Sequence, residues 1–339
     1  MNSFILQKDK LQDFLDSLHE CQIWAPVKRG TATTFELTKD LKDISLDLKK
    51  QVVVSKSAIF PQTEPLFTFD RNGTPKETDL AEPRDTIVLG IRPCDARSFN
   101  LLDPVFKGDF SDPYYLKRRN NTVLIGIACN DPFLNCFCTS IGGNPFSQEG
   151  LDLLFTEFDG AFYIEVITEK GKQLIDITPS LYTPATAEDT KQKEGLANAS
   201  EGRVKRQIDS NGLPEKLSGI FEHPIWKQFA SKCIGCGICT YSCPTCYCFD
   251  MQDETTAKKG RRVRIWDSCM FSEYTLHASG HNPRQNRNDR LRNRIYHKFK
   301  FNIDNHGVAS CVGCGRCITL CPVNVDLIEN LTAIRKINL

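Results

Sequence analysis

The chain has 339 residues, 40% of them hydrophobic, so it is long enough for two or three domains that each bury a core. Its 43 lysine and arginine residues nearly balance its 42 aspartate and glutamate residues, which disfavours function through nucleic acid or an acidic membrane surface. The first residues include early charges and no apolar run of signal-peptide length, and no later segment approaches the roughly 18 apolar residues of a membrane span. We therefore expect a cytoplasmic protein without a membrane span, whose 16 cysteines act as metal ligands or reactive thiols.

Residues 1–180 are predicted to form an α/β domain. A helix is expected first, because Leu11, Phe14, Leu15 and Leu18 share one helical face. Runs of β-branched and aromatic residues then predict strands at 52–54, 86–91, 122–128 and 161–167. The segment ARSFNLLDPVF, between the second and third runs, is long enough for a crossover helix. Since a strand, a crossover and another strand are typical of parallel neighbours, we expect a mostly parallel sheet.

The composition changes after this domain. Residues 181–222 are polar and rich in alanine, threonine and charge, which favours a linker. Residues 223–339 are rich in cysteine and are predicted to be largely helical, with helices over 284–299 and over the segment that contains Val325, Ile328, Leu331 and Ile334. The fold class predicted for the whole chain is therefore α+β with several domains.

The pattern Cys-x2-Cys-x2-Cys-x3-Cys-Pro occurs twice, as CIGCGICTYSCP at 233–244 and as CVGCGRCITLCP at 311–322. A cubane [4Fe-4S] cluster needs one thiolate per iron, and in two-cluster ferredoxins the fourth cysteine of each motif binds the other cluster. This crossed assignment predicts two [4Fe-4S] clusters. The first would be held by Cys233, Cys236, Cys239 and Cys321, and the second by Cys311, Cys314, Cys317 and Cys243. Glycines at 235, 237, 313 and 315 leave room for the loops to close.

Zinc is the alternative metal for such cysteines, but zinc sites pair two Cys-x2-Cys knuckles, and this longer pattern exceeds four-coordination. The segment 245–310 between the motifs is long enough for helices, so we expect a helical two-cluster ferredoxin domain. The predicted helix at 284–299 is strongly basic. Its cations either form a solvated face, offset the negative charge of the clusters, or dock an acidic partner.

Four cysteines of the N-terminal half form a second candidate site. Cys94 follows the predicted strand 86–91, Cys129 ends the strand 122–128, and Cys136 and Cys138 lie in the loop that comes next. Two parallel neighbours would present the first two thiols at the same edge of the sheet, where α/β folds place their sites. The four thiols predict a third [4Fe-4S] cluster, and the alternative is that they pack as small apolar residues.

The remaining cysteines are less clearly assigned. Cys246, Cys248 and Cys269 either form a redox-active or sulfur-handling site or pack around a cluster and tune its potential. Cys21 is predicted to be a core residue. No motif for a nucleotide, a flavin or a c-type haem is present.

Six segments together resemble the β subunit of cytoplasmic sulfhydrogenases and the A subunit of anaerobic sulfite reductases. They are GIRPCDARS, IACNDPFLNCFCTSIGG, CIGCGICTYSCPTCYCFD, RIWDSCMF, ASGHNPR and CVGCGRCITLCP, and they extend over roughly residues 50–330. The resemblance includes the four N-terminal cysteines. It implies an electron-transfer subunit of an anaerobic oxidoreductase complex, which is not itself the catalytic subunit.

The partners implied by this resemblance are an FAD-containing flavoprotein subunit that handles NAD(P)H and a terminal catalytic subunit. Whether the terminal subunit is a hydrogenase, a sulfite reductase or a related enzyme stays open. The alternative function is a sulfur or disulfide reductase that uses Cys246 and Cys248 as redox-active thiols.

Overall fold

The computed structural model describes residues 3–30, 32–46, 54–70, 73, 75–77, 85–158 and 160–338. The chain folds as two compact units. The first unit comprises Met1–Ile59, Glu82–Arg206 and Val312–Cys314, and the second comprises Phe60–Ala81, Gln207–Cys311 and Gly315–Leu339. Each unit therefore includes a short segment that is remote in sequence from the rest of that unit.

The first unit contains a mixed sheet of eight strands among its described residues. In spatial order these are β10 (Tyr182–Pro184), β1 (Ser3–Gln7), β9 (Ala161–Val166), β8 (Leu153–Glu157), β7 (Thr122–Ile127), β6 (Thr86–Ile91), β2 (Gln22–Arg29) and β3 (Ala32–Leu37). The four central strands, β8, β7, β6 and β2, are mutually parallel, whereas the outer pairings are antiparallel. The expected parallel sheet is thus confirmed for the centre only.

Three of the predicted strands are confirmed as β6, β7 and β9. The prediction at 52–54 falls largely outside the described residues, and Val54 is not in a strand. The sequence did not predict β1, β2, β3, β8 or β10. β2 contains a proline, β1, β8 and β10 have five residues or fewer, and β3 is half polar, with the sequence ATTFEL.

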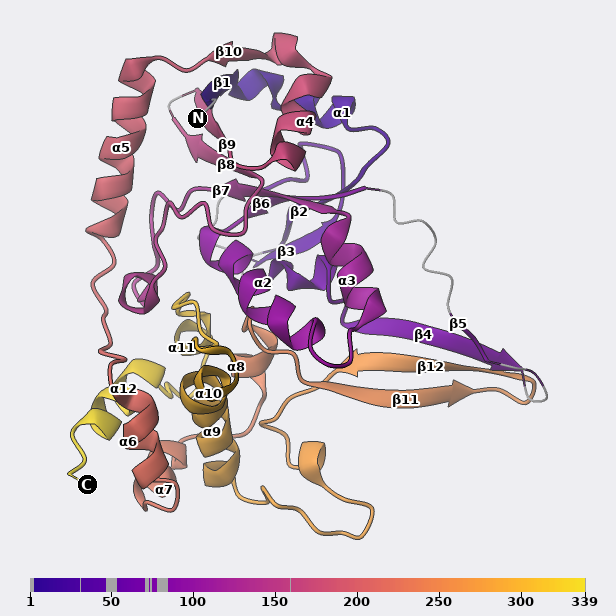
Figure 1. Cartoon of the computed structure of the whole chain (residues 1–339), viewed down its shortest axis with the longest axis vertical. Coiled ribbons are helices and arrows are strands. Elements are labelled where there is room, and N and C mark those ends of the chain that lie inside the picture. The colour runs from indigo at the N-terminus through magenta and orange to yellow at the C-terminus, as the bar shows by residue number, and fades with distance from the viewer. Residues whose placement is uncertain are drawn as a thin grey trace. The chain divides into compact units, whose positions relative to one another are not determined.

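Helices lie on both faces of this sheet (Figure 1). α1 (Leu11–Ser17) and α4 (Glu169–Ile177) are on one side, and α2 (Pro93–Phe106) and α3 (Pro113–Asn120) are on the other. α2 and α3 connect the parallel neighbours β6 and β7, which confirms the predicted crossover. In the part of the chain that the structure describes, no helix combines the length and the apolar character needed to span a membrane.

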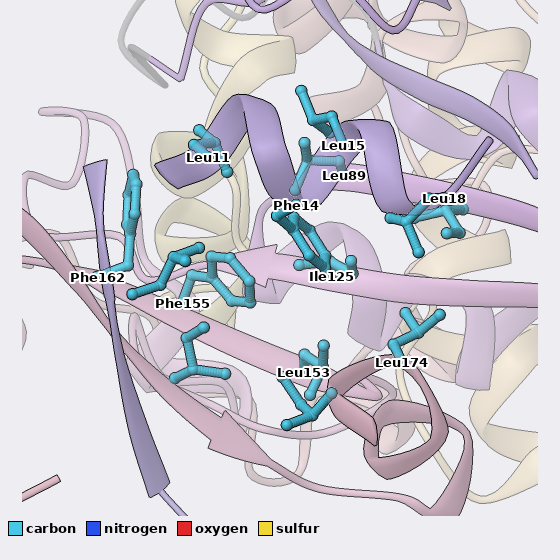
Figure 2. Close-up of a cluster of buried hydrophobic side chains, with 14 of the residues drawn as sticks. Leu11, Phe14, Leu15, Leu18, Leu89, Ile125, Leu153, Phe155, Phe162 and Leu174 are labelled. Atoms are coloured by element: carbon cyan, nitrogen blue, oxygen red, sulfur yellow. The ribbon is translucent and has the colours of Figure 1, made fainter. Parts of the chain in front are cut away.

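A buried hydrophobic cluster holds α1 and α4 against the sheet (Figure 2). The ring of Phe14 is fully buried, with its centroid 6.1 Å from that of Phe155. Ile87 and Leu89 of β6 also join this cluster, and Val88 between them is equally buried. Burial of both strand faces explains why β6 is a continuous apolar run rather than an alternating pattern.

Residues 181–222, predicted as a polar linker, instead contain two helices, α5 (Ala187–Glu201) and α6 (Leu213–Gly219). α5 is mostly exposed, so it lacks the apolar stripe by which periodicity detects a helix. Its start is fixed by a capping box, in which the Thr186 hydroxyl accepts from the Asp189 amide and the Asp189 carboxylate accepts from the Thr186 amide. This local signal, rather than hydrophobic pattern, identifies the helix.

The second unit is only partly helical. Its helices after α6 are α7 (Ile225–Ala230), α8 (Ile238–Tyr241), α9 (Arg287–Tyr296), α10 (Asn302–His306), α11 (Arg316–Thr319) and α12 (Leu327–Arg335), with a π-helical turn η7 (His297–Phe301) between α9 and α10. The helices predicted at 284–299 and near the C-terminus are confirmed as α9 and α12.

A four-stranded antiparallel sheet in the second unit corrects the prediction of a largely helical C-terminal domain. Its order is β11 (Phe249–Thr255), β12 (Lys259–Trp266), β4 (Thr63–Asp70) and β5 (Lys76–Glu77). β11 is exposed along its whole length and therefore shows no hydrophobic alternation. β4 pairs with a strand about two hundred residues later, and a buried ion pair between Glu64 and Arg264 joins the two strands.

The Phe14→Ala variant should lose about 3–5 kcal/mol of unfolding free energy, because it leaves a cavity under α1. Phe110→Ala is the matched control, since the Phe110 side chain is 95% exposed, and its change should stay within about 0.5 kcal/mol. Chemical denaturation under anaerobic conditions measures both values. Equal losses in the two variants would contradict the assigned core.

Candidate iron–sulfur centres

Both cysteine motifs fold as a tight loop that leads into a single helical turn. α8 follows the first loop, and α11 follows the second. The loop glycines have positive φ angles, which are 71° at Gly235, 74° at Gly237, 65° at Gly313 and 70° at Gly315. Glycine adopts this left-handed conformation without strain. The loops therefore require glycine for their φ angles, as well as for the room that the sequence analysis predicted.

Cysteines from both motifs line one cavity in the second unit. They are Cys233, Cys236, Cys239, Cys321 and Cys317. The first four are the set that the crossed assignment predicts for one cluster. The backbone amide of Val325 also donates a hydrogen bond to Cys321 Sγ at 3.2 Å, a contact of the kind that tunes cluster potentials.

The buried Cys243 lies beside the start of the second motif. The ammonium of Lys298 donates to Cys243 Sγ at 3.2 Å and to the carbonyl of Ser310 at 2.9 Å, and Ser310 directly precedes Cys311. The Thr245 hydroxyl donates to the same carbonyl at 2.9 Å. Lys298 thus joins the last cysteine of the first motif to the residue that precedes the first cysteine of the second motif.

Buried cations follow one face of α9 and its π-helical extension. Arg290, Arg294 and Lys298 are spaced four residues apart and are 7%, 4% and 2% exposed. Arg290 donates to the carbonyl of Met270 at 3.0 Å, and Arg294 donates to that of Cys239 at 3.2 Å. For Arg294 and Lys298, whose pKa values the charges of nearby cysteines raise, the structure favours the charge-offset hypothesis over a solvated helix face, because a buried cation is stabilised by partners of opposite charge, whereas Arg290 is held by carbonyl oxygens.

The thiols and cations shift the pKa values of one another. Burial lowers the pKa of Lys298, but the negative charge of nearby cysteine sulfur, that of Cys243 first, raises it by more, so the ammonium stays charged. A hydrogen bond from Cys246, together with the charges of Lys298 and Arg294, holds the pKa of Cys243 well below its ordinary value despite burial. Cys243 is therefore poised as a thiolate, which is the form that binds metal.

The four N-terminal cysteines belong to the first unit. Cys136 and Cys138 are buried in a small cluster with Val204. Burial, followed by the charge of Cys129, raises the pKa of Cys136 to about 12 and that of Cys138 to about 11, so Cys129 lies close to both. Cys94 is in the first turn of α2, directly after β6, at the same sheet edge as the end of β7.

The tip of the second cysteine motif lies next to this site. The sequence did not predict this contact. Residues Val312–Cys314 belong to the first unit, where Cys136 Sγ donates to the Cys314 carbonyl at 3.6 Å and the Phe137 amide donates to the Gly313 carbonyl at 2.8 Å. A Cβ atom on Gly313 would lie 2.6 Å from the Cys138 backbone, so only glycine fits. No local sequence pattern signals a contact between residues this far apart in the chain.

The other cysteines separate into distinct environments. Cys246 forms a hydrogen bond with the predicted ligand Cys243, and Cys248 forms one with Cys269. Cys21 packs partly buried against the hydrophobic core of the first unit, as expected. The spacing Cys-x-Cys suggested that Cys246 and Cys248 act together. The charge of Cys248 does act on Cys246, but each has a different thiol as its hydrogen-bond partner.

The donor sets fit iron–sulfur clusters. Each predicted set consists of thiols alone, and the two ferredoxin-type sets lie at loops with left-handed glycines and have buried cations beside them. Within the described residues, no group of three or more His, Cys, Asp or Glu side chains is arranged to hold a single metal ion. A cubane instead binds each thiolate to a different iron. The individual ligand assignments stay predictions.

Comparisons with known proteins agree with this chemistry. Residues 232–325 match the family model of a 4Fe-4S dicluster domain. Sulfhydrogenase 2 subunit beta of Pyrococcus furiosus is 30% identical over 333 residues, which cover 98% of each chain. The site thus defines an iron–sulfur electron-transfer subunit. The chain belongs to the sulfhydrogenase β-subunit family.

The crossed assignment predicts which cysteine variants lose the same cluster. Cys321→Ala should remove the same electron paramagnetic resonance signal as Cys236→Ala, and Cys243→Ala the same signal as Cys311→Ala. Spectra of the four reduced full-length variants, recorded beside the wild type, test this. If Cys321→Ala instead matches Cys311→Ala, each motif binds its own cluster.

Lys298→Met should lower the reduction potential of the cluster that Cys243 is predicted to bind, because a buried positive charge stabilises the more negative, reduced state. A shift of about 60 mV corresponds to a tenfold change in the equilibrium of a one-electron couple. Lys300→Met is the control, since Lys300 pairs with Asp304 and is less buried. Potentiometric titration should show the shift for Lys298→Met alone, and equal potentials in both variants would contradict the assigned role.

Proposed function

We propose that this chain carries three [4Fe-4S] clusters and relays electrons between an FAD-containing flavoprotein subunit that handles NAD(P)H and a terminal catalytic subunit. Two clusters are assigned to the crossed sets of the two motifs. The third is assigned to Cys94, Cys129, Cys136 and Cys138. The dicluster family match and the subunit designation of the Pyrococcus relative support a role as one member of a complex.

The observation that carries the proposal is the cavity lined by Cys233, Cys236, Cys239 and Cys321. Three cysteines of one motif meet the last cysteine of the other, and Arg294 lines the same cavity. A buried cation beside several thiolates offsets the negative charge that they would otherwise concentrate in a low dielectric. This arrangement suits a centre that stays bound in the protein while its charge changes by one electron.

Bound [4Fe-4S] clusters supply one-electron transfer at potentials that the surrounding protein tunes. The chain's own residues provide the rest. Apolar side chains such as Ile238 and Leu291 line the cavity with the thiols and limit the access of water. Arg294 and Lys298 set the local charge along one face of the same helical segment, beside Cys239 and Cys243 respectively.

The third site is supported by its neighbour. Cys136 contacts the carbonyl of Cys314, a predicted ligand of a ferredoxin-type cluster. Metal centres that exchange electrons have to be close together, and adjacent ligand loops meet this requirement. The alternative, that these cysteines only pack as small apolar residues, gives no reason for three thiols to gather next to a ligand loop.

Iron content tests the third cluster. The intact chain, purified or reconstituted without oxygen, should contain about twelve irons, and Cys94→Ala should contain about eight. Cys21→Ala is the control and should keep the wild-type content, because Cys21 packs in the core of the first unit. If the wild type itself contains no more than about eight irons, the third cluster does not exist.

The relay function predicts what the isolated chain does and which proteins accompany it. Alone, it should be reduced reversibly by a low-potential donor but should turn over neither hydrogen nor sulfite.

Anaerobic purification through a tag on this chain should recover an FAD flavoprotein and a terminal subunit. Nickel and iron in the terminal subunit would indicate a hydrogenase, and sirohaem would indicate a sulfite reductase. Turnover by the isolated chain would contradict the relay.

A further inference from the structure

Two cysteines outside all predicted ligand sets meet at the base of the β11–β12 hairpin. Phe249 pairs with Trp266, and the Asp267 amide donates to the carbonyl of Cys248 at 2.9 Å, so Cys248 is fixed opposite the end of β12. The turn that follows contains Cys269. It is held by the buried Ser268, whose hydroxyl lies 2.7 Å from the Thr240 hydroxyl and accepts from the Met270 amide at 3.1 Å.

The thiols of Cys248 and Cys269 are joined by a hydrogen bond. The Tyr274 hydroxyl forms a second hydrogen bond with Cys248. Cys246, two residues before Cys248, is hydrogen-bonded to Cys243 instead. Among the three extra cysteines, the hydrogen bonds thus join Cys246 to a predicted cluster ligand and Cys248 to Cys269, although the charge of Cys248 also acts on Cys246.

The two thiols differ in their access to solvent. Cys248 is partly exposed and leads into β11, which is exposed along its length, whereas Cys269 is buried. The hydrogen bond to Cys248, followed by burial, raises the pKa of Cys269, so this thiol keeps its proton and donates it to the sulfur of Cys248. An accessible sulfur supported by a buried thiol is the arrangement of a dithiol exchange site.

We propose that Cys248 and Cys269 form a two-electron thiol–disulfide site that reacts with a small disulfide compound. The Cys248 thiolate attacks one sulfur of the disulfide, whose S–S bond breaks, and the first thiolate leaves and takes up a proton. Cys269 then loses its proton and attacks the Cys248 sulfur, and the second thiolate leaves with a proton. The net reaction converts one disulfide and two cysteine thiols into two small thiols and a Cys248–Cys269 disulfide, and excess dithiol reductant reverses it.

This proposal goes beyond the electron relay and changes the cysteine pair that the sequence suggested. Spacing alone paired Cys246 with Cys248, because they are neighbours in Cys-x-Cys. The hairpin instead brings Cys248 to Cys269, a partner 21 positions later (269 minus 248). The site is independent of cluster ligation, so loss of either thiol should leave every cluster in place.

The experiment uses glutathione disulfide on the full-length chain, purified anaerobically with its clusters. The wild type should release about two glutathione thiols per chain and form a Cys248–Cys269 disulfide, detected by peptide mapping. Cys269→Ser should stop at the first step, with glutathione attached to Cys248. Cys248→Ser should not react at Cys269, because that thiol is buried. Cys21→Ser is the control and should behave as the wild type.

Iron content and reversible reduction are measured on each variant. We expect these values to be unchanged. The relay is tested by iron content and reduction, and the dithiol site by thiol release and peptide mapping, so either proposal can fail without the other. Three results would overturn the dithiol site. They are a disulfide that includes Cys246, the absence of any reaction at Cys248 in wild type with full iron content, and the loss of a cluster in Cys248→Ser or Cys269→Ser, which would make these thiols ligands.

Discussion

The burial of thiolate sulfur is the constraint on which the second unit depends. A cluster brings several negative ligands into a region of low dielectric, where an uncompensated charge costs several kcal/mol. The helical segment formed by α9 and η7 meets this cost with a row of buried cations. Arg294 reaches the loop of the first motif, and Lys298 reaches Cys243 beside the second. A single helical segment therefore places cations beside both cysteine motifs.

The residue before Lys298 adds no second positive charge next to its ammonium. A π-helical turn begins at His297, and such turns are rare and frequently occur at functional sites. Burial, followed by the nearby Lys298, lowers the pKa of His297 to about 4, so its ring is neutral near pH 7. Its Nε2 atom lies 3.0 Å from the Tyr247 hydroxyl. The helix thus places a neutral ring, and not a second cation, beside the ammonium that contacts Cys243.

Both units contain segments that are distant in sequence. β4 and β5, from residues 63–77, complete the sheet of the second unit, whereas Val312–Cys314 belongs to the first. A fragment that begins near residue 222 would lack the strand that pairs with β12, including the carboxylate that neutralises the buried Arg264. The cluster-bearing region therefore needs residues from both halves of the chain, and neither half of the sequence corresponds to a complete unit.

The sequence by itself determined the chemistry, because ligand type and spacing are local. The duplicated motif specified thiol loops, β6 and β7 were evident from continuous apolar runs, and α1 followed from its periodic leucines. The polar helix α5 and the exposed strand β11 carry no such pattern, so hydrophobic periodicity could not predict them. Only the tertiary structure decided which thiols meet, since the contacts of Cys136 with Cys314 and of Cys248 with Cys269 depend on how distant segments pack.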